Sequence, residues 1–154
     1  MSHVDYFKAQ AKKLFKDYKT QTSYIDEVDG HTYFSYSPTY FDIGRIFLEY
    51  DWDEENFTLM KAQHLFARMV GFDKWGLLIR ASDAELELAK QLWENQEKIH
   101  LEEWQMYVAR VESDNGIILG SNAKLDIFLQ VFAERDGHCS QLGGYRVTSS
   151  LNNA

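Results

Sequence analysis

Cysteine and proline are almost absent from this chain of 154 residues, which contains one of each. The single cysteine, Cys139, excludes an intramolecular disulfide and argues against a zinc site built on cysteine. Because proline interrupts helices, the single proline, Pro38, favours long helices over a loop-rich fold. A chain of this length can bury a core without such covalent or metal staples.

Long apolar runs are also missing. No stretch approaches the roughly 18 apolar residues of a membrane-spanning helix. The range Met1 to Lys19 is polar and rich in lysine, and it contains no apolar segment typical of a signal peptide. The sequence therefore predicts a cytoplasmic protein with no membrane partner.

Basic residues are too few to balance the acids, and the formal net charge is −8. Residues 1–19 hold five lysines against two acids, whereas residues 82–103 hold seven acids against two lysines. This balance argues against nucleic acid as a partner and suits a basic protein or a second copy of the chain. The opposite local charges also allow pairing between helices of one molecule.

No sequence signature of a nucleotide, nucleophile or metalloprotease site is present. The acidic segment 51–56 begins like a calcium loop, but Asn56 stands where that loop needs glycine and Ala62 where it needs glutamate. Glu97 and His100 have the spacing of one di-iron ligand pair, and the second pair that such a site requires is missing. We therefore predict no catalytic residue, no metal site and no cofactor.

Apolar residues recur at helical spacing along most of the chain. This periodicity predicts helices over residues 3–19, 58–70, 77–79 and 82–112, and a last helix that begins near Ser121 or Asn122. Another helix is expected to begin at Ser37-Pro38, because serine can cap a helix and proline suits its first position. Gly71 is expected to end one helix, and the capping box of Ser82 and Glu85 is expected to begin the next.

Two segments interrupt this pattern. β-forming residues flank Asp29-Gly30, a pair that suits a two-residue turn, so a small hairpin is expected near residues 24–36. The polar residues Gln96 and His100 lie in the apolar stripe of the long helix 82–112. A break in this helix near Lys98 is therefore an open alternative to one continuous helix. The polar tail 136–154 is expected either to close a second small hairpin or to be flexible.

The segment from Ala62 to Trp75 resembles a helical module of small bacterial proteins, which runs from an Ala-Gln pair through an alanine and a Gly-Phe pair to a tryptophan. Similar segments occur in glyoxalase-related proteins and beside ankyrin repeats. The resemblance covers residues 37–95 of the chain. It implies a fold element of bacterial origin and carries over neither metal ligands nor an activity.

Together these patterns predict a mainly α fold, a compact bundle of five to six helices that forms one domain over residues 1–154. The leading functional hypothesis is a non-enzymatic, acidic protein-interaction module, such as an accessory, immunity-like or antitoxin-like protein. One alternative is a small ligand-binding protein or enzyme with an aromatic pocket, and another is a homodimer formed by the stripe 86–111. The candidate binding residues are Tyr36, Tyr40, Trp75, Trp93, His100 and Trp104.

Overall fold

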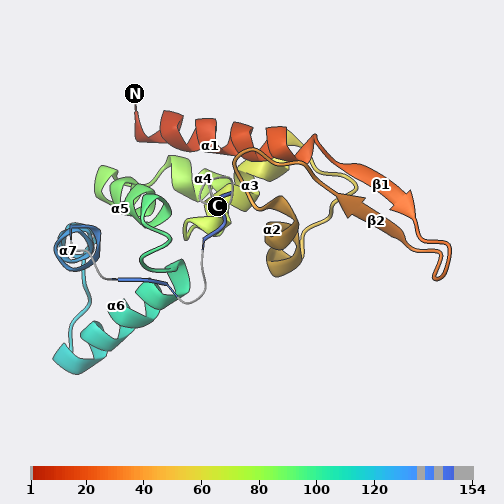
Figure 1. The fold of residues 1–154 in the computed structure, drawn as a ribbon. Helices are drawn as coiled ribbons and strands as arrows, with labels where there is room; N and C mark the ends of the chain where they lie inside the picture. The colour runs from red at the N-terminus through yellow and green to blue at the C-terminus, as the bar shows by residue number, and fades with distance from the viewer. Residues whose placement is uncertain (1, 135–137, 141–143, 148–154) are drawn as a thin grey trace. The chain divides into compact units, whose positions relative to one another are not determined.

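The computed structural model describes residues 2–134, 138–140 and 144–147. These residues form seven α-helices, one short π-helix and a two-stranded antiparallel sheet (Figure 1). The predicted fold class, mainly helical with a small hairpin, is confirmed. The elements are α1 (His3–Tyr18), β1 (Thr22–Ile25), β2 (Thr32–Ser35), α2 (Ile43–Tyr50), α3 (Leu59–Met69), α4 (Trp75–Ile79), α5 (Asp83–Glu94), α6 (Leu101–Asn115), α7 (Ser121–Phe128) and η1 (Leu129–Ala133).

The chain divides into two compact units. Unit 1 comprises Met1–Phe7 and Ala67–Gly144, and unit 2 comprises Lys8–Phe66 and Tyr145–Ala154. Most of the tail 136–154, predicted either to close a second hairpin or to be flexible, lies outside the described residues. The structure describes residues 138–140 and 144–147 of this tail. Among the described residues, no helix is both long and apolar enough to cross a bilayer.

The hairpin forms where the sequence predicts it, but its turn is longer than two residues. Ile25 pairs with Thr32, and the N–H of Asp26 donates to the carbonyl of His31 at 2.9 Å. The loop between Asp26 and His31 therefore holds four residues, and Gly30 supplies the positive φ of +72°. The Asp26 side chain accepts hydrogen bonds from two loop amides, which stabilises this longer turn.

The helix predicted to begin at Ser37-Pro38 begins later, at Ile43. The cause is Asp17, which is 1% exposed and whose carboxylate accepts three backbone N–H groups. The amides of Thr39, Tyr40 and Phe41 donate to it at 2.9, 2.8 and 2.7 Å. These bonds hold the three residues in a non-helical conformation, because their N–H groups point to the carboxylate and not along a helix axis.

Aromatic rings form much of the core of unit 2. The ring centroids of Tyr18 and Phe47 each lie 4.9 Å from that of Phe57, and the ring of Tyr36 packs against both Tyr18 and Phe47. Phe41 and Phe66 pack edge to face at 6.1 Å, and both are fully or almost fully buried. Much of the high aromatic content of the chain therefore lies in its interior, where the rings pack against one another.

Gly71 and Ser82 act as the sequence predicts. Gly71 follows α3 with φ +103°, a left-handed conformation that ends the helix. The hydroxyl of Ser82 accepts the N–H of Glu85 at 3.2 Å, and the Glu85 carboxylate accepts the N–H of Ser82 at 3.3 Å. This capping box starts α5.

The predicted helix 82–112 is two helices, α5 and α6, separated by residues 95–100. The break occurs where Gln96 and His100 interrupt the apolar stripe. The amide of Gln96 donates to the carbonyl of Trp93 at 2.8 Å, and the imidazole of His100 accepts the N–H of Glu102 at 3.2 Å. The first side chain therefore helps to end α5, and the second helps to start α6.

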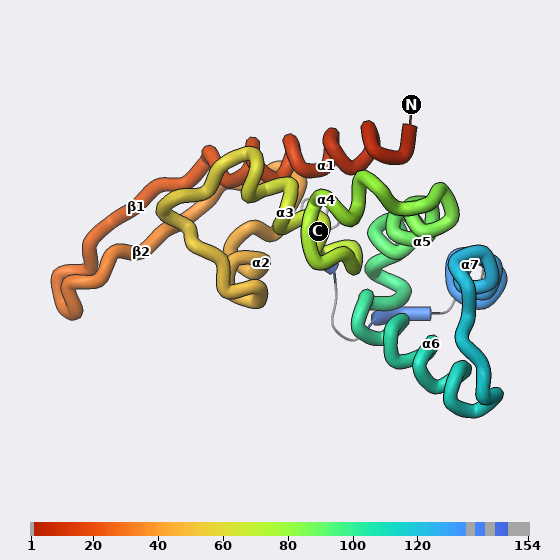
Figure 2. Tube along the Cα trace, turned by 180° about the vertical axis from the view of Figure 1, so that it is seen from behind, coloured from red at the N-terminus to blue at the C-terminus, as the bar shows by residue number. Residues whose placement is uncertain are grey.

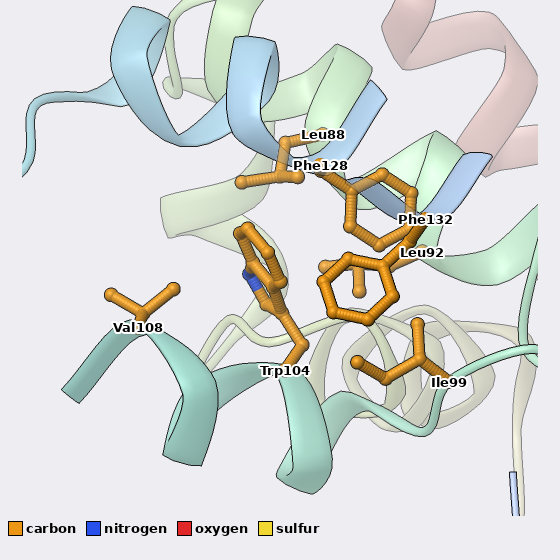
Figure 3. Close-up of a cluster of buried hydrophobic side chains, with 7 residues drawn as sticks. All are labelled: Leu88, Leu92, Ile99, Trp104, Val108, Phe128 and Phe132. Atoms are coloured by element: carbon orange, nitrogen blue, oxygen red, sulfur yellow. The ribbon is translucent and has the colours of Figure 1, made fainter. Parts of the chain in front are cut away.

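A cluster of buried apolar side chains joins α5, α6, α7 and η1 in unit 1 (Figure 3). The ring of Trp104 meets Phe128 edge to face at 5.1 Å and Phe132 at 5.9 Å. The other members are Leu88, Leu92, Ile99 and Val108. The stripe 86–111 therefore turns inward, and Leu86, Ala89 and Trp93 in it are also 3–4% exposed.

Candidate functional site

An open groove of about 380 Å³ lies beside this cluster, entirely within unit 1. Four residues of the cluster, on α5 and α6, also line the groove, so part of the apolar core borders solvent here. The apolar lining residues are Val70, Phe72, Leu88, Ala89, Leu92, Leu101, Trp104, Val108 and Ala109. The volume is within the range of about 300–1,000 Å³ that is typical of binding pockets.

Polar side chains from three helices line the rest of the groove: Glu85, Gln105, Glu112, Ser121 and Lys124. Both carboxylates also have a structural role, because Glu85 caps α5 and Glu112 accepts the N–H of Leu119 at 2.7 Å. Each bond occupies one oxygen of a carboxylate that has two. Among the described residues, the half-buried ammonium of Lys124 has no hydrogen-bond or ion-pair partner. The groove therefore presents an apolar floor with charges of both signs at its edge.

Of the six candidate binding residues, Trp104 is the one that lines the groove. Trp93 is 4% exposed on α5, and Trp75 is half-buried at the start of α4. His100 is 8% exposed at the start of α6. The structure therefore does not gather the four unit 1 candidates into one aromatic pocket.

Tyr36 and Tyr40 belong to unit 2. The hydroxyl of Tyr36 accepts the Gln21 amide at 2.9 Å and donates to the Glu54 carboxylate at 2.8 Å. Burial, followed by the bond to Glu54, raises the pKa of this hydroxyl well above its ordinary value of 10.0. Tyr40 donates its N–H to Asp17, and its ring lies 5.1 Å from the Lys13 ammonium. Both tyrosines therefore help to hold unit 2 together.

His100, Glu103 and Ser140 form a polar cluster whose residue types invite comparison with a nucleophilic site. The Ser140 hydroxyl donates to the Glu103 carboxylate at 2.6 Å, and the same oxygen of Glu103 accepts the N–H of His100 at 2.8 Å. The Ser140 bond is the main cause of the lowered pKa of Glu103, which makes it a poor general base. The Nδ1 atom of His100 caps α6. This arrangement suits a helix cap that also holds the segment at Ser140.

Two positions considered as metal ligands have other partners. Asp53 accepts the N–H of Glu55 at 2.9 Å, and this bond is the main cause of its lowered pKa. At Glu97 it is the backbone carbonyl, and not the carboxylate that would bind a metal, that accepts the N–H of Ser140 at 2.8 Å. Across residues 2–134, 138–140 and 144–147, no group of three or more His, Cys, Asp or Glu side chains is placed to hold a metal ion. Cys139 is exposed, and its thiol donates a weak hydrogen bond to the Ser140 carbonyl, with the sulfur and oxygen atoms 3.8 Å apart.

A second exposed surface is the hairpin of unit 2. Figures 1 and 2 show β1 and β2 side by side, extending past the C-terminal end of α1. Its exposed apolar side chains are Tyr24 at 58%, Ile25 at 69%, Val28 at 96% and Tyr33 at 41%. Monomeric proteins rarely leave such side chains together at the surface without a partner.

Comparisons with known proteins give no assignment for either surface, since no family model, curated protein or solved structure matches the chain. The resemblance of the segment from Ala62 to Trp75 to a bacterial helical module therefore stays a prediction.

The groove residues Gln105, Ala109 and Lys124 were not among the sequence candidates. Each is a common surface residue on a helix, and each becomes notable only where α5, α6 and α7 meet. The one sequence candidate that pointed to the groove is Trp104. Its position in the apolar stripe is consistent with both a core residue and a binding residue. The exposure of the hairpin side chains was harder still to predict. In two short strands, the alternation of apolar and polar residues does not indicate whether a face of the sheet is covered.

Proposed function

We propose that the chain is a non-enzymatic protein-interaction module, and that the groove of unit 1 binds the apolar face of a basic amphipathic helix. The observation that carries the proposal is a groove with an apolar floor that stays open to solvent where α5, α6 and α7 meet. Grooves of this kind commonly receive a partner helix through apolar side chains at positions i, i+3, i+4 and i+7.

The openness of the groove favours a helix over a small molecule. Gln105 and Ala109 are exposed although they line the groove, so a small ligand would stay in contact with water. Small-molecule sites normally bury about 70–90% of their ligand. A helix laid across the groove would cover the floor and its edge together.

Charge favours a basic partner. The edge of the groove holds two carboxylates, Glu85 and Glu112, against one ammonium, Lys124. Asp83 and Glu102 add exposed negative charge on α5 and α6. With a net charge of −8, the chain attracts a basic segment over a longer range than the contacts themselves.

The ligand-binding alternative has less support. It rests on a pocket lined by several of the tyrosines and tryptophans, and Trp104 is the one member of that set at the groove. The homodimer alternative through residues 86–111 has little surface available, because Leu86, Ala89, Trp93 and Trp104 are buried within unit 1.

Binding of a synthetic helix tests the proposal. The probe is an amphipathic peptide with leucine on one face and lysine on the other, and the comparison peptide carries glutamate in place of lysine. We expect the Leu-Lys peptide to bind, as measured by calorimetry, and the Leu-Glu peptide to bind much more weakly. Failure of the Leu-Lys peptide to bind would overturn the proposal.

A matched pair of variants separates the groove from general charge attraction. Ala109→Arg places a cation in the groove, whereas Met106→Arg places one on the same helix at a residue that is 66% exposed and does not line the groove. Ala109→Arg should weaken binding at least about tenfold, because a charge would occupy the apolar floor. Equal loss in the two variants would indicate nonspecific attraction and contradict a groove site.

A further inference from the structure

Among the residues that the structure describes, the hairpin of unit 2 pairs with no third strand, and neither of its edges carries the usual protection of an edge strand. Strands β1 and β2 contain no charged residue and no proline. Natural edge strands are commonly blunted by lysine, proline, a bulge or a covering element. A two-stranded hairpin is also only marginally stable in water without further packing. These features indicate that an edge of this hairpin pairs with another strand.

The register of the hairpin identifies the groups that are available at the edge of β1. The pair Asp26 and His31 is hydrogen-bonded, and hydrogen-bonded pairs alternate along an antiparallel ladder. Tyr24 and Tyr33 therefore form a hydrogen-bonded pair, and the N–H and C=O groups of Ser23 and Ile25 point away from β2. These four groups are the ones that a new strand would meet.

We propose that the occupant is β1 of a second copy of this chain, paired antiparallel about Tyr24 to give a four-stranded sheet with two-fold symmetry. In this register, Ser23 of each copy exchanges hydrogen bonds with Ile25 of the other. Tyr24 lies opposite its own equivalent. Closed two-fold pairing of this type uses one surface twice and leaves no further β1 edge exposed.

Side chains on one face of the sheet match this arrangement. The rings of Tyr24 and Tyr33 already stack within one hairpin, with centroids 5.6 Å apart. Directly paired residues point to the same face, so the second copy would extend this stack to a row of four tyrosine rings. Tyr24 is 58% exposed in the single chain, and the pairing would cover part of that surface.

Charge complementarity favours a second copy over an arbitrary strand. The pairing directs the turn of each hairpin, with Glu27 and Asp29, toward the C-terminal end of α1 of the other copy, next to which Lys19 lies. Lys16 and Lys19 are exposed at that end of α1, and Glu27 is exposed in the turn. Hydrogen bonds from the Tyr33 hydroxyl and from the N–H of His31 lower the pKa of Asp29, which keeps it ionised. Each copy therefore carries both halves of the charge pair.

The oligomeric state tests this proposal. Sedimentation equilibrium over a concentration series should show a reversible monomer–dimer equilibrium, because the pairing of two strands as short as four residues gives a small interface. A chain that stays monomeric at the highest concentration would overturn the proposal. The groove of unit 1 is separate from this result, so the Ala109→Arg comparison tests the proposed function independently.

Two proline variants locate the pairing edge. Ser23→Pro removes an amide on the open edge of β1, and Thr32→Pro removes one on the open edge of β2, and neither removes a bond between β1 and β2. Ser23→Pro should raise the dimer dissociation constant roughly tenfold or more, because two symmetric hydrogen bonds are lost, and Thr32→Pro should leave it unchanged. The reverse order of effects would overturn the assignment to β1.

A charge exchange tests the identity of the occupant without altering the strands. Glu27→Lys brings the net charge of −8 closer to zero, so general repulsion between copies predicts stronger association. Local pairing with Lys19 predicts weaker association, and it predicts recovery in the double variant Lys19→Glu, Glu27→Lys. Stronger association of the Glu27→Lys variant, or no recovery in the double variant, would contradict the two-fold pairing.

Discussion

Helices α2 and α5 begin by different means, and the difference separates the two units. In unit 1, α5 begins at a capping box in which Ser82 and Glu85, three residues apart, satisfy each other's N–H groups. In unit 2, Asp42 occupies the N-cap position before α2, and its side chain makes no cap hydrogen bond. The N–H of Asp42 donates instead to the carbonyl of Tyr145 at 2.7 Å, and the three preceding amides donate to Asp17.

The start of α5 therefore depends on residues that are neighbours in sequence, whereas the start of α2 depends on residues far away in sequence. Loss of a local cap removes one or two bonds at a helix end that water can reach. Loss of the remote acceptor Asp17 leaves three N–H groups without their acceptor, and the N–H of the buried Phe41 is one of them, which costs more per bond.

Substitution of Asp17 should have the largest effect. In Asp17→Asn, one acceptor oxygen becomes an NH₂ group that faces the backbone donors of residues 39–41. We expect a loss of about 3 kcal/mol or more in the free energy of unfolding. Denaturant unfolding measures this loss, and hydrogen exchange should become faster at the amides of residues 39–41.

The control for this variant is Asp73→Asn, which makes the same chemical change at an exposed residue. Surface substitutions of this kind usually change stability by less than about 0.5 kcal/mol. Similar losses in the two variants would show that the Asp17 carboxylate does not hold the start of α2.

Gly144→Ala should have the next largest effect, because it tests a long-range contact in unit 1. A Cβ atom at residue 144 would lie 2.7 Å from the Oε1 atom of Gln96, which is 5% exposed. We expect a loss of about 1–2 kcal/mol from this overpacking. In the background of Gln96→Ala the same substitution should cost less, and a double-mutant cycle measures the difference. An equal cost in both backgrounds would contradict the contact.

Removal of the local cap should cost less again. Ser82→Ala deletes the hydroxyl that accepts the N–H of Glu85, and we expect a loss of about 1 kcal/mol in the free energy of unfolding. Ser82→Asp, which restores an acceptor at the same position, should stay close to the unchanged protein. A loss as large as that of Asp17→Asn would remove the distinction between the two helix starts.

The smallest effect concerns pH and the half-buried Glu103. Its folded-state pKa lies below the ordinary value of 4.5, mainly because Ser140 donates to it. Its contribution to stability is therefore present above the unfolded-state pKa and is lost as the pH falls through the folded-state pKa. Ser140→Ala should reduce the loss of stability on acidification, measured by unfolding at neutral and acidic pH. Ser113→Ala, an exposed serine, should leave the pH profile unchanged.

The candidate site could be predicted from the sequence only in part. Aromatic residues were chosen for their capacity to line a pocket, and the structure places Tyr36 in the packed cluster of unit 2 and Trp104 at the groove. Polar residues flank both of them in the sequence, which therefore does not distinguish the packed ring from the one at the groove. Whether the apolar floor of the groove is exposed depends on which helices pack over it. The spacing of apolar residues in the sequence does not contain that information.

Local chemistry in the sequence determined the helical class of this protein, the hairpin, the end of α3 at Gly71 and the start of α5 at Ser82. Each of these depends on residues within a few positions of one another, through periodicity, positive φ or a reciprocal cap. Only the tertiary structure decided the late start of α2, the burial of Asp17 and the open groove. Those features depend on groups that meet after the chain has folded, and a buried N–H takes whichever acceptor then lies within reach.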